Sequence, residues 1–398
     1  MASIYVHFPW CLSKCPYCDF VSFAVEPKEI DHAGYAKAVL REAEVRSRDI
    51  AKRGKPIAIT SIYVGGGTPS LWEPHELGRV LKGFFALFHV SHDAEITVEC
   101  NPTSLDRQRA IALRDWGVNR LSIGVQSLCA ASLRFLGRRH DPDGARRAID
   151  AALQAGIERL SADLIFGLPN QSADDARAEA LALATTGVQH LSCYELSIEP
   201  DTLFGERRKR GLLPMADEST VADAFVAIDA ALEARGFRHY EISNYATAGQ
   251  ESQHNLTYWR GDEYIGLGVA AFGFLRHGAG GTRYQNVDDP KKYIVATQAA
   301  PQPPRMKSRQ IESGLLMSSE SLDKQALFRE RIMLGLRIAE GVDLARAGRD
   351  LGIDPWTSHR LKAIDKLTRC GRLTRAGDIL RIPHAAWLYT NDTVSSLF

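Results

Sequence analysis

The chain has 398 residues, of which 45% are hydrophobic and 24% are charged, and its formal net charge is only +1. This length allows one large α/β domain and a smaller second part, because single hydrophobic cores stop growing at roughly 250 to 300 residues. A net charge this close to zero gives no indication that the protein binds nucleic acid or an anionic membrane. No apolar run of about 18 residues could span a bilayer, and the first residues lack the features of a secretory signal. We therefore expect a cytoplasmic protein that binds no nucleic acid and has no transmembrane segment.

From residue 4 to about residue 198, short β-rich runs alternate with helical stretches. The predicted strands span residues 4–8, 57–64, 95–100, 120–126, 159–166 and 190–197. Glycine ends the helix before three of these strands, at Gly117, Gly156 and Gly187. Alternating strands and helices predict parallel βαβ units. The fold class is therefore α/β, an open partial (β/α)6 barrel of the TIM type, with ligands expected at the carboxyl ends of the strands.

The pattern changes after residue 199, where we expect a helix over residues 217–235 and β-rich runs over 237–245 and 264–275. A polar loop containing His254 and Asn255 is expected between these runs. The proline-rich segment 299–304 is typical of a linker. Three helical stretches and a short β pair follow it, which predicts a mainly helical, winged-helix-like domain. The expected domains are the barrel over residues 1–235, an extension that covers it over 236–300, and a C-terminal domain over 301–398.

The C-terminal domain shows no strong basic excess, so we expect a structural or partner-binding role for it and no binding to DNA. The basic run of residues 207–210 is interpreted as a solvated surface segment.

Cysteines supply the strongest chemical signal in the sequence. The chain has seven of them, an odd number that argues against a disulfide framework. Cys11, Cys15 and Cys18 fall within eight residues just after the first strand, which Pro9 ends. Thiolates suit iron–sulfur clusters and zinc. A structural zinc with His7 as the fourth ligand is one interpretation, although no second cysteine pair is present to complete the usual arrangement.

In the other interpretation, the three thiolates hold three corners of a [4Fe–4S] cube and leave the fourth iron open. That iron could chelate the amino and carboxylate groups of S-adenosylmethionine, so that the reduced cluster passes one electron to the sulfonium. An open iron could also link two chains into a dimer.

Further polar or glycine-rich motifs stand at the ends of the next strands. Residues 65–69 read Gly-Gly-Gly-Thr-Pro, in which glycines allow a close approach of the backbone to a ligand. Glu99, Gln126 and Asp163 lie in or after three consecutive apolar strands, where a polar side chain is costly unless it holds a partner. Arg138 could pair with a ligand carboxylate through its planar guanidinium, and Arg139 is the competing candidate.

This ordered set, from Tyr5 through C-x-x-x-C-x-x-C to Asp-Leu-Ile-x-Gly-Leu-Pro, resembles the radical S-adenosylmethionine superfamily and its HemN/HemW branch of porphyrin metabolism. The resemblance covers essentially the whole chain. It implies a [4Fe–4S] cluster on the three cysteines and S-adenosylmethionine beside it. The residues that it implies for binding S-adenosylmethionine are Tyr5, Tyr17, Gly66, Gly67, Thr68, Glu99, Gln126, Arg138 and Asp163.

Two features favour the haem chaperones of this branch over its decarboxylating enzymes. HemN-type proteins carry a further cysteine two residues after the third and a longer N-terminal extension, whereas this chain has Phe20 there and begins four residues before Tyr5. The run from His254 to Trp259 resembles the HNxxYW element that is associated with haem binding. The resemblance implies His254 as an axial ligand of haem iron, with Tyr258 and Trp259 against the macrocycle.

The function implied is a haem chaperone that carries haem as cargo and passes it to haem-requiring apoproteins, among them respiratory proteins of membranes. Two alternatives stay open at this point. One is an oxygen-independent coproporphyrinogen III dehydrogenase, which converts two propionates to vinyl groups by radical abstraction. The other is a zinc-stabilised binding module without redox chemistry. The scaffold could in principle cleave S-adenosylmethionine, but we do not expect coproporphyrinogen dehydrogenation, and no catalytic residue is assigned.

Overall fold

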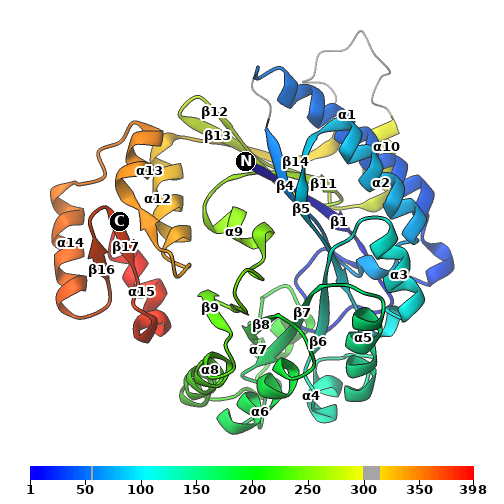
Figure 1. The fold of residues 1–398 in the computed structure, drawn as a ribbon, viewed down its shortest axis with the longest axis horizontal. Helices are drawn as coiled ribbons and strands as arrows, with labels where there is room; N and C mark the ends of the chain where they lie inside the picture. Colours follow the sequence, from blue (N-terminus) through cyan, green and yellow to red (C-terminus); the bar gives the residue numbers. More distant parts are fainter. Residues whose placement is uncertain (55–56, 299–313) are drawn as a thin grey trace.

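One curved sheet organises the barrel in the computed structural model, which describes residues 1–54, 57–298 and 314–398. The strands of this sheet follow the spatial order β14-β13-β12-β11-β1-β4-β5-β6-β7-β8-β10-β9, and its six central strands are parallel (Figure 1). These six are β1 (Ala2–Phe8), β4 (Ala58–Gly66), β5 (His89–Cys100), β6 (Arg120–Gln126), β7 (Arg159–Phe166) and β8 (His190–Glu195). Among the described strands, β14 and β9 each pair on one side only. The predicted open partial barrel is therefore confirmed.

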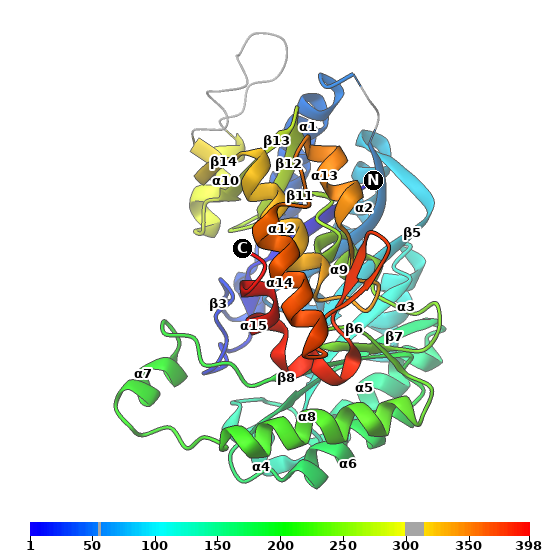
Figure 2. The ribbon, with the colours of Figure 1, turned by 90° about the vertical axis from the view of Figure 1, so that its left-hand side faces the viewer.

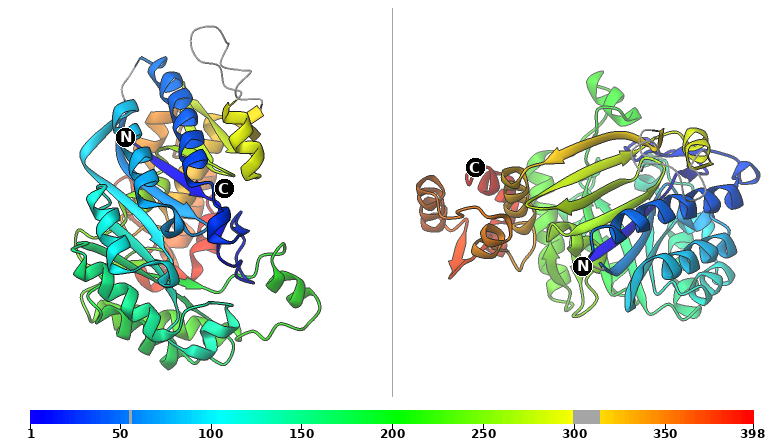
Figure 3. Two further views of the ribbon diagram at one scale, coloured as in Figure 1. Left: turned by 90° about the vertical axis from the view of Figure 1, so that its right-hand side faces the viewer. Right: turned by 90° about the horizontal axis from the view of Figure 1, so that it is seen from above.

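Helices follow the parallel strands and cover the outer face of the sheet (Figures 1 and 3). They are α1 (His32–Ala51), α2 (Pro74–Leu87), α3 (Arg107–Asp115), α4 (Ala130–Phe135), α5 (Pro142–Gln154), α6 (Ala173–Ala184) and α8 (Glu218–Glu233). Gly117, Gly156 and Gly187 have φ angles of 94°, 78° and 94° at the helix ends, as the sequence predicts. Residues with a Cβ rarely adopt this left-handed conformation, so each glycine lets the chain turn into the next strand without steric strain.

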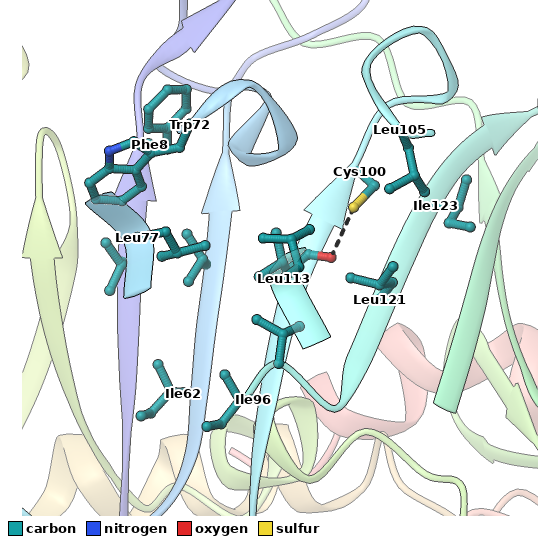
Figure 4. Close-up of a cluster of buried hydrophobic side chains, with 14 of the residues drawn as sticks. Phe8, Ile62, Trp72, Leu77, Ile96, Cys100, Leu105, Leu113, Leu121 and Ile123 are labelled. Atoms are coloured by element: carbon teal, nitrogen blue, oxygen red, sulfur yellow. Dashed lines mark hydrogen bonds between the residues drawn. The ribbon is translucent and has the colours of Figure 1, made fainter. Parts of the chain in front are cut away.

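The main hydrophobic core lies between the sheet and these helices. Figure 4 shows Leu77 of α2 and Leu113 of α3 near Ile62, Ile96 and Leu121 of the strands β4, β5 and β6. All five side chains are buried, and each contributes about 1.5 to 3 kcal/mol when fully buried. This packing fixes the strands whose carboxyl ends carry the predicted site.

Additional strands extend the sheet at both edges. At one edge β11 (Glu263–Gly268) pairs parallel with β1, and β12 (Phe272–His277), β13 (Gly280–Asn286) and β14 (Leu316–Leu322) follow in antiparallel order. At the other edge β10 (Asn244–Ala246) pairs with β8, and β9 (Arg238–Glu241) pairs with β10. Each β-rich run predicted beyond residue 236 therefore contains two strands. The predicted linker 299–304 lies outside the described residues.

A buried polar network fixes the first of these extensions to α1. The Glu42 carboxylate forms an ion pair with Arg46 at 3.1 Å and accepts hydrogen bonds from Asn286 at 2.9 Å and Tyr293 at 2.7 Å. It also accepts from the backbone N–H of Gly268 at 3.0 Å. These partners come from β11, β13 and α10 (Pro290–Gln298), so one carboxylate on α1 holds three later elements.

The expectation of a polar loop around His254 is wrong, because the segment forms the helix α9 (Gln253–Trp259). The Ser252 hydroxyl accepts from the Asn255 N–H at 3.3 Å, as a local N-cap. The Glu95 carboxylate on β5 accepts from the N–H groups of Gln253 and His254 at 3.1 and 3.2 Å. Because this second cap comes from a strand more than 150 residues earlier, the local sequence does not reveal the helix.

The C-terminal domain confirms the predicted helices and β-wing. It contains α12 (Lys324–Gly335), α13 (Leu344–Leu351), α14 (Ser358–Arg369) and a small sheet of β15 (Val342–Asp343), β17 (Ile379–Arg381) and β16 (Thr374–Ala376). A 3-10 helix η4 (His384–Tyr389) and α15 (Thr390–Ser395) follow them. Backbone hydrogen bonds from Ile242 to Arg337 and from Ala339 to Tyr240 join the domain to the barrel edge.

The exposure of the basic segment and the length and polarity of the helices bear on what composition predicts. The basic residues 207–210 are all exposed, at the end of α7 (Leu203–Lys209), which projects from the barrel in Figure 2. No helix within the described ranges is both long and apolar enough to cross a membrane.

Candidate functional site

A cavity of about 410 Å³ opens at the carboxyl ends of the parallel strands. This volume falls in the range of about 300 to 1,000 Å³ that small-molecule sites occupy. The cysteine loop and the ends of the strands line it together. The predicted site residues in its wall are Cys11, Cys15, Tyr17, Cys18, Gly66, Gly67, Thr68, Glu99, Gln126, Arg138 and Asp163. The fold thus brings to one place residues that span more than 150 positions of the sequence.

The three cysteines stand on a short loop that follows β1. Cys11 ends the two-residue strand β2 (Trp10–Cys11), which pairs with β3 (Phe23–Ala24), and a turn joins the N–H of Cys18 to the carbonyl of Cys15 at 3.1 Å. All three thiols are free and partly exposed. Burial raises the pKa of Cys11 and raises that of Cys18 to about 11. A metal that binds here must therefore displace protons from the sulfurs.

The neighbouring donors fit a cluster held by three sulfurs. Thr68 donates its hydroxyl to the Cys11 sulfur at 3.3 Å, and the Arg138 guanidinium donates to the Cys15 sulfur at 3.6 Å. Cys100 also borders the cavity, but its sulfur lies in the hydrophobic core near Leu105 and donates to the Val98 carbonyl (Figure 4). Hydrogen bonds to the sulfurs and an incomplete set of protein thiols suit an iron–sulfur cluster with one accessible iron.

His7, the fourth ligand in the zinc interpretation, forms hydrogen bonds within the fold. Its Nδ1 bonds with the Tyr5 hydroxyl at 3.0 Å, and its Nε2 donates to the Val21 carbonyl at 2.7 Å. Burial lowers the pKa of His7 to about 4, so the ring is neutral at pH 7. With both ring nitrogens used, His7 offers no lone pair to a metal in this conformation.

The glycine-rich end of β4 packs against the cysteine loop. Gly66 has a φ of 106°, and a Cβ there would meet the His7 ring at 2.5 Å. A Cβ on Gly67 would meet the Trp10 carbonyl at 2.6 Å. The N–H groups of Gly67 and Thr68 donate to the carbonyls of Phe8 and Trp10 at 2.7 and 2.8 Å. These glycines therefore let the cysteine loop approach β4 closely, in addition to any contact with a ligand.

Two partly buried carboxyl groups face the cavity from the strands β5 and β7. Glu99 accepts hydrogen bonds from the Tyr63 hydroxyl at 2.8 Å and the Gly66 N–H at 3.0 Å. Burial raises the pKa of Glu99 to about 7. Asp163 accepts from the Ser122 hydroxyl at 3.2 Å, and burial raises its pKa as well. Perturbed carboxyl groups in a cavity are typical of binding and catalytic sites.

The structure distinguishes between the two candidate arginines. Arg138 is partly buried, and its Nη2 donates to the Gly124 carbonyl at 2.8 Å. Its buried Nε finds no hydrogen-bond partner within the part of the chain that the structure describes. Arg139 is exposed. Arg138 therefore keeps an unused donor, as expected of a residue that receives a ligand carboxylate.

Tyr5 and His254 are not among the residues that line the cavity, and both rings stack on Tyr63, which does line it. His254 is 1% exposed, and its two ring nitrogens bond with the hydroxyls of Ser61 and Tyr258, both at 3.0 Å. Burial lowers the pKa of His254 to about 3, so the ring is neutral. The neighbouring Asn255 does line the cavity.

Several cavity residues escaped the sequence reasoning, including Tyr63, Arg120 and His190. Arg120 is 2% exposed, and its Nη2 has no partner among the residues described. A signal was present in β6, where polar or small residues at 120, 122, 124 and 126 alternate with buried Leu121, Ile123 and Val125. Because side chains alternate across a strand, this pattern indicates a polar barrel interior.

Comparisons with known proteins agree with this geometry. A family model described as the radical SAM superfamily matches residues 5–182, and one described as the HemN C-terminal domain matches residues 322–389. The chain is 41% identical to the heme chaperone HemW of Escherichia coli (strain K12) over 272 residues, which cover 68% of this chain and 69% of the relative. It is 33% identical to the heme chaperone HemW of Bacillus subtilis (strain 168), with 88% and 87% covered.

Among solved structures, the chain resembles the coproporphyrinogen III oxidase HemN from Escherichia coli, with a TM-score of 0.80 and 20% identity. The match covers 100% of this chain and 89% of that one. At this identity it shows the fold, and it confirms the barrel with its C-terminal domain. The sequence relatives carry the assignment further: the chain belongs to the HemW family, within the HemN/HemW branch of the radical SAM superfamily.

Proposed function

We propose that this protein is a haem chaperone that holds a [4Fe–4S] cluster, binds S-adenosylmethionine beside it, and passes haem to haem-requiring apoproteins. The relatives from Escherichia coli and Bacillus subtilis, which it matches over most of their length, are named heme chaperones. The observation that carries the proposal is that three free, partly exposed thiols share one wall of a cavity with an arginine that has an unused donor.

The residues of the cavity divide into two groups in this proposal. Cys11, Cys15 and Cys18 would hold the cluster, and the Thr68 hydroxyl and the Arg138 guanidinium would stabilise its sulfur ligands. S-adenosylmethionine would lie against Tyr17, Gly66, Gly67, Thr68, Glu99, Gln126, Arg138 and Asp163, with Tyr5 stacked on Tyr63 of the cavity wall. When the cluster and S-adenosylmethionine are both bound, the reduced cluster can supply one electron to S-adenosylmethionine.

Arg138 would orient S-adenosylmethionine through its carboxylate. The Arg138 Nε is buried and unpaired among the described residues, whereas its other nitrogens are already held by the Cys15 sulfur and the Gly124 carbonyl. A carboxylate at this position would complete the donor set with a charge-assisted hydrogen bond.

His254 would serve haem as a neutral axial ligand. For this, one of its ring nitrogens must leave its present partner, Ser61 or Tyr258. The helix that carries it, α9, has seven residues and lies between the sheet and α12 of the C-terminal domain (Figure 1). A small movement of this helix would expose His254, with Tyr258 and Trp259 beside it, to a flat macrocycle.

The proposal is tested by anaerobic reconstitution followed by haem titration and transfer. We expect about four irons per chain, one bound haem, and movement of that haem to a haem-free apoprotein, followed by absorption spectroscopy. Zinc-loaded, colourless protein would instead support a zinc-stabilised module. Haem that binds but never leaves in the presence of an apoprotein would contradict the chaperone role.

An alternative function is oxidative decarboxylation of coproporphyrinogen III. The likeness of the whole chain to HemN is the observation that favours it, although this likeness concerns the fold. Reduced, reconstituted protein incubated with S-adenosylmethionine and coproporphyrinogen III distinguishes the two functions. Unchanged substrate excludes the dehydrogenase, and formation of vinyl groups excludes a pure chaperone.

A further inference from the structure

A second cluster of potential ligands lies outside the cavity, where the C-terminal domain meets the barrel. Asp229 of α8, His239 of β9 and His384 of η4 direct one atom each toward a common point. The Asp229 Oδ1 lies 2.8 Å from the His239 Nδ1 and 3.0 Å from the His384 Nε2, and the two nitrogens are 3.4 Å apart. Two imidazoles and one carboxylate therefore converge from three separate elements.

The hydrogen bonding of His239 favours a shared cation. Its Nε2 lies 3.2 Å from the Ile242 carbonyl, which can only accept, so this nitrogen carries a proton. In the neutral ring, Nδ1 then carries no proton, and its lone pair faces the Asp229 oxygen at 2.8 Å. Two acceptors at this distance repel each other unless a proton or a metal ion lies between them. Donation of the second ring N–H to a backbone carbonyl is also what orients most histidines that bind metals.

Aromatic side chains lock the His239 ring in place. It stacks on Tyr245 with ring centroids 4.0 Å apart and lies 4.3 Å from the Trp387 ring. The side chains of His239, Asp229 and His384 are 3%, 17% and 45% exposed. One side of the cluster is therefore rigid and buried, and the other remains open to a water molecule.

We propose that Asp229, His239 and His384 bind a divalent transition-metal ion, zinc in the first place, with water as the fourth ligand. Zinc at about 2.0 to 2.1 Å from each donor in tetrahedral geometry requires donor atoms about 3.3 Å apart. The present separations of 2.8 to 3.4 Å need only small adjustments. Imidazole and carboxylate donors suit zinc and its neighbours in the transition series, whereas calcium and magnesium prefer oxygen ligands alone.

Such an ion would fasten the C-terminal domain to the barrel. Asp229 and His239 belong to the edge of the barrel that carries β9, while His384 follows the β-wing 145 residues further along the chain. Figures 1 and 2 show this last part of the chain, in red, near α8. Binding at this junction would stabilise the folded protein by mass action, and it involves no change in oxidation state.

The test uses cluster-loaded protein, so that zinc cannot occupy the three cysteines. Protein is reconstituted anaerobically, dialysed against a chelator, and titrated with zinc chloride by calorimetry, with iron and zinc counted by elemental analysis. We expect one zinc per chain in addition to the irons, and a higher melting temperature with zinc present. Asp229→Asn and His384→Ala should each weaken zinc binding by at least about tenfold and remove the rise in melting temperature.

His92→Ala is the matched control, because His92 and Asp93 form an exposed pair whose atoms lie 3.6 Å apart. Its zinc affinity should equal that of the wild type. A variant with alanine at Cys11, Cys15 and Cys18 should also keep the zinc, which separates this site from the cluster. The proposal would be overturned if the wild type bound no zinc, or if His384→Ala bound zinc as tightly as the wild type. In that case a proton, and not a metal ion, lies between Asp229 and His239.

Discussion

The imidazole of His254 stacks on the phenol ring of Tyr63, with ring centroids 4.8 Å apart and planes inclined by 22°. The Tyr63 hydroxyl donates to Glu99 in the wall of the cavity. Tyr63 therefore lies between the histidine proposed to bind haem and the carboxylate proposed to contact S-adenosylmethionine. This contact gives a physical route by which occupation of one site can affect the other.

Haem affinity should depend on His254 and on the hydroxyl that now holds it. His254→Ala should lower haem affinity at least about tenfold if the imidazole ligates the iron. Tyr258→Phe removes the competing hydrogen bond to Nε2 but keeps the flat ring, so haem affinity should rise by about two- to tenfold, since such a bond is worth about 0.5 to 1.5 kcal/mol. Haem titration of reconstituted protein measures both. Unchanged haem affinity in both variants would contradict the assignment of His254 as the haem ligand.

Glu99 should make stability depend on pH. Its pKa rises from 4.5 to about 7 on folding, so its contribution to stability is present below pH 4.5 and is lost as the pH rises through 7. Glu99→Gln should therefore gain stability relative to the wild type between pH 5 and 8, by up to about 3 kcal/mol. Chemical denaturation at several pH values checks this. A difference that does not change with pH would contradict a Glu99 carboxyl group whose pKa is raised on folding.

Arg138 should control the affinity for S-adenosylmethionine. Arg138→Lys keeps a positive charge but removes the planar fork and the free Nε, so affinity should fall by about 10- to 150-fold, the equivalent of a charge-assisted hydrogen bond. Arg139→Lys, at the exposed neighbouring position, is the control and should bind like the wild type. Calorimetric titration of cluster-loaded protein measures the affinities. Equal losses in both variants would argue against a specific contact from Arg138.

The Glu42 network should contribute strongly to stability. Glu42→Ala removes the acceptor that the Asn286 amide, the Tyr293 hydroxyl and the Gly268 N–H share, and breaking such a buried network costs about 3 to 5 kcal/mol. Glu44→Ala on the same helix breaks only the exposed pair with Arg48 and should cost less than about 1 kcal/mol. Thermal or chemical denaturation compares them. Similar losses in the two variants would show that Glu42 does not fix the sheet extension to α1.

The central barrel could be predicted from the sequence because its signals are local. β6 and β7 begin and end at the predicted residues 120–126 and 159–166, since each is a short β-rich segment that follows a helix ended by glycine. The three cysteines and the motifs at the strand ends were equally readable. The parallel arrangement then dictates that all of them meet at one edge of the sheet.

The features that could not be predicted depend on contacts between distant residues. The helix α9 receives its second cap from Glu95, and the cluster of Asp229 and His239 needs His384 from the far end of the chain. The strands β13 and β14 are partly polar; β13 pairs with β12, and β14 pairs with β13, so each depends on a strand edge that its own sequence does not reveal. His7 gave no sign that both of its nitrogens would be used within the fold.

The most direct test of the account is the metal content and spectrum of anaerobically reconstituted protein, with and without S-adenosylmethionine. We expect about four irons and four sulfides per chain, and a change in the paramagnetic resonance spectrum of the reduced cluster when S-adenosylmethionine is added. Cys15→Ala should lose the cluster, and Cys100→Ala should keep it. A cluster that persists in Cys15→Ala, or a spectrum that S-adenosylmethionine leaves unchanged, would contradict a cube held by three sulfurs with one open iron.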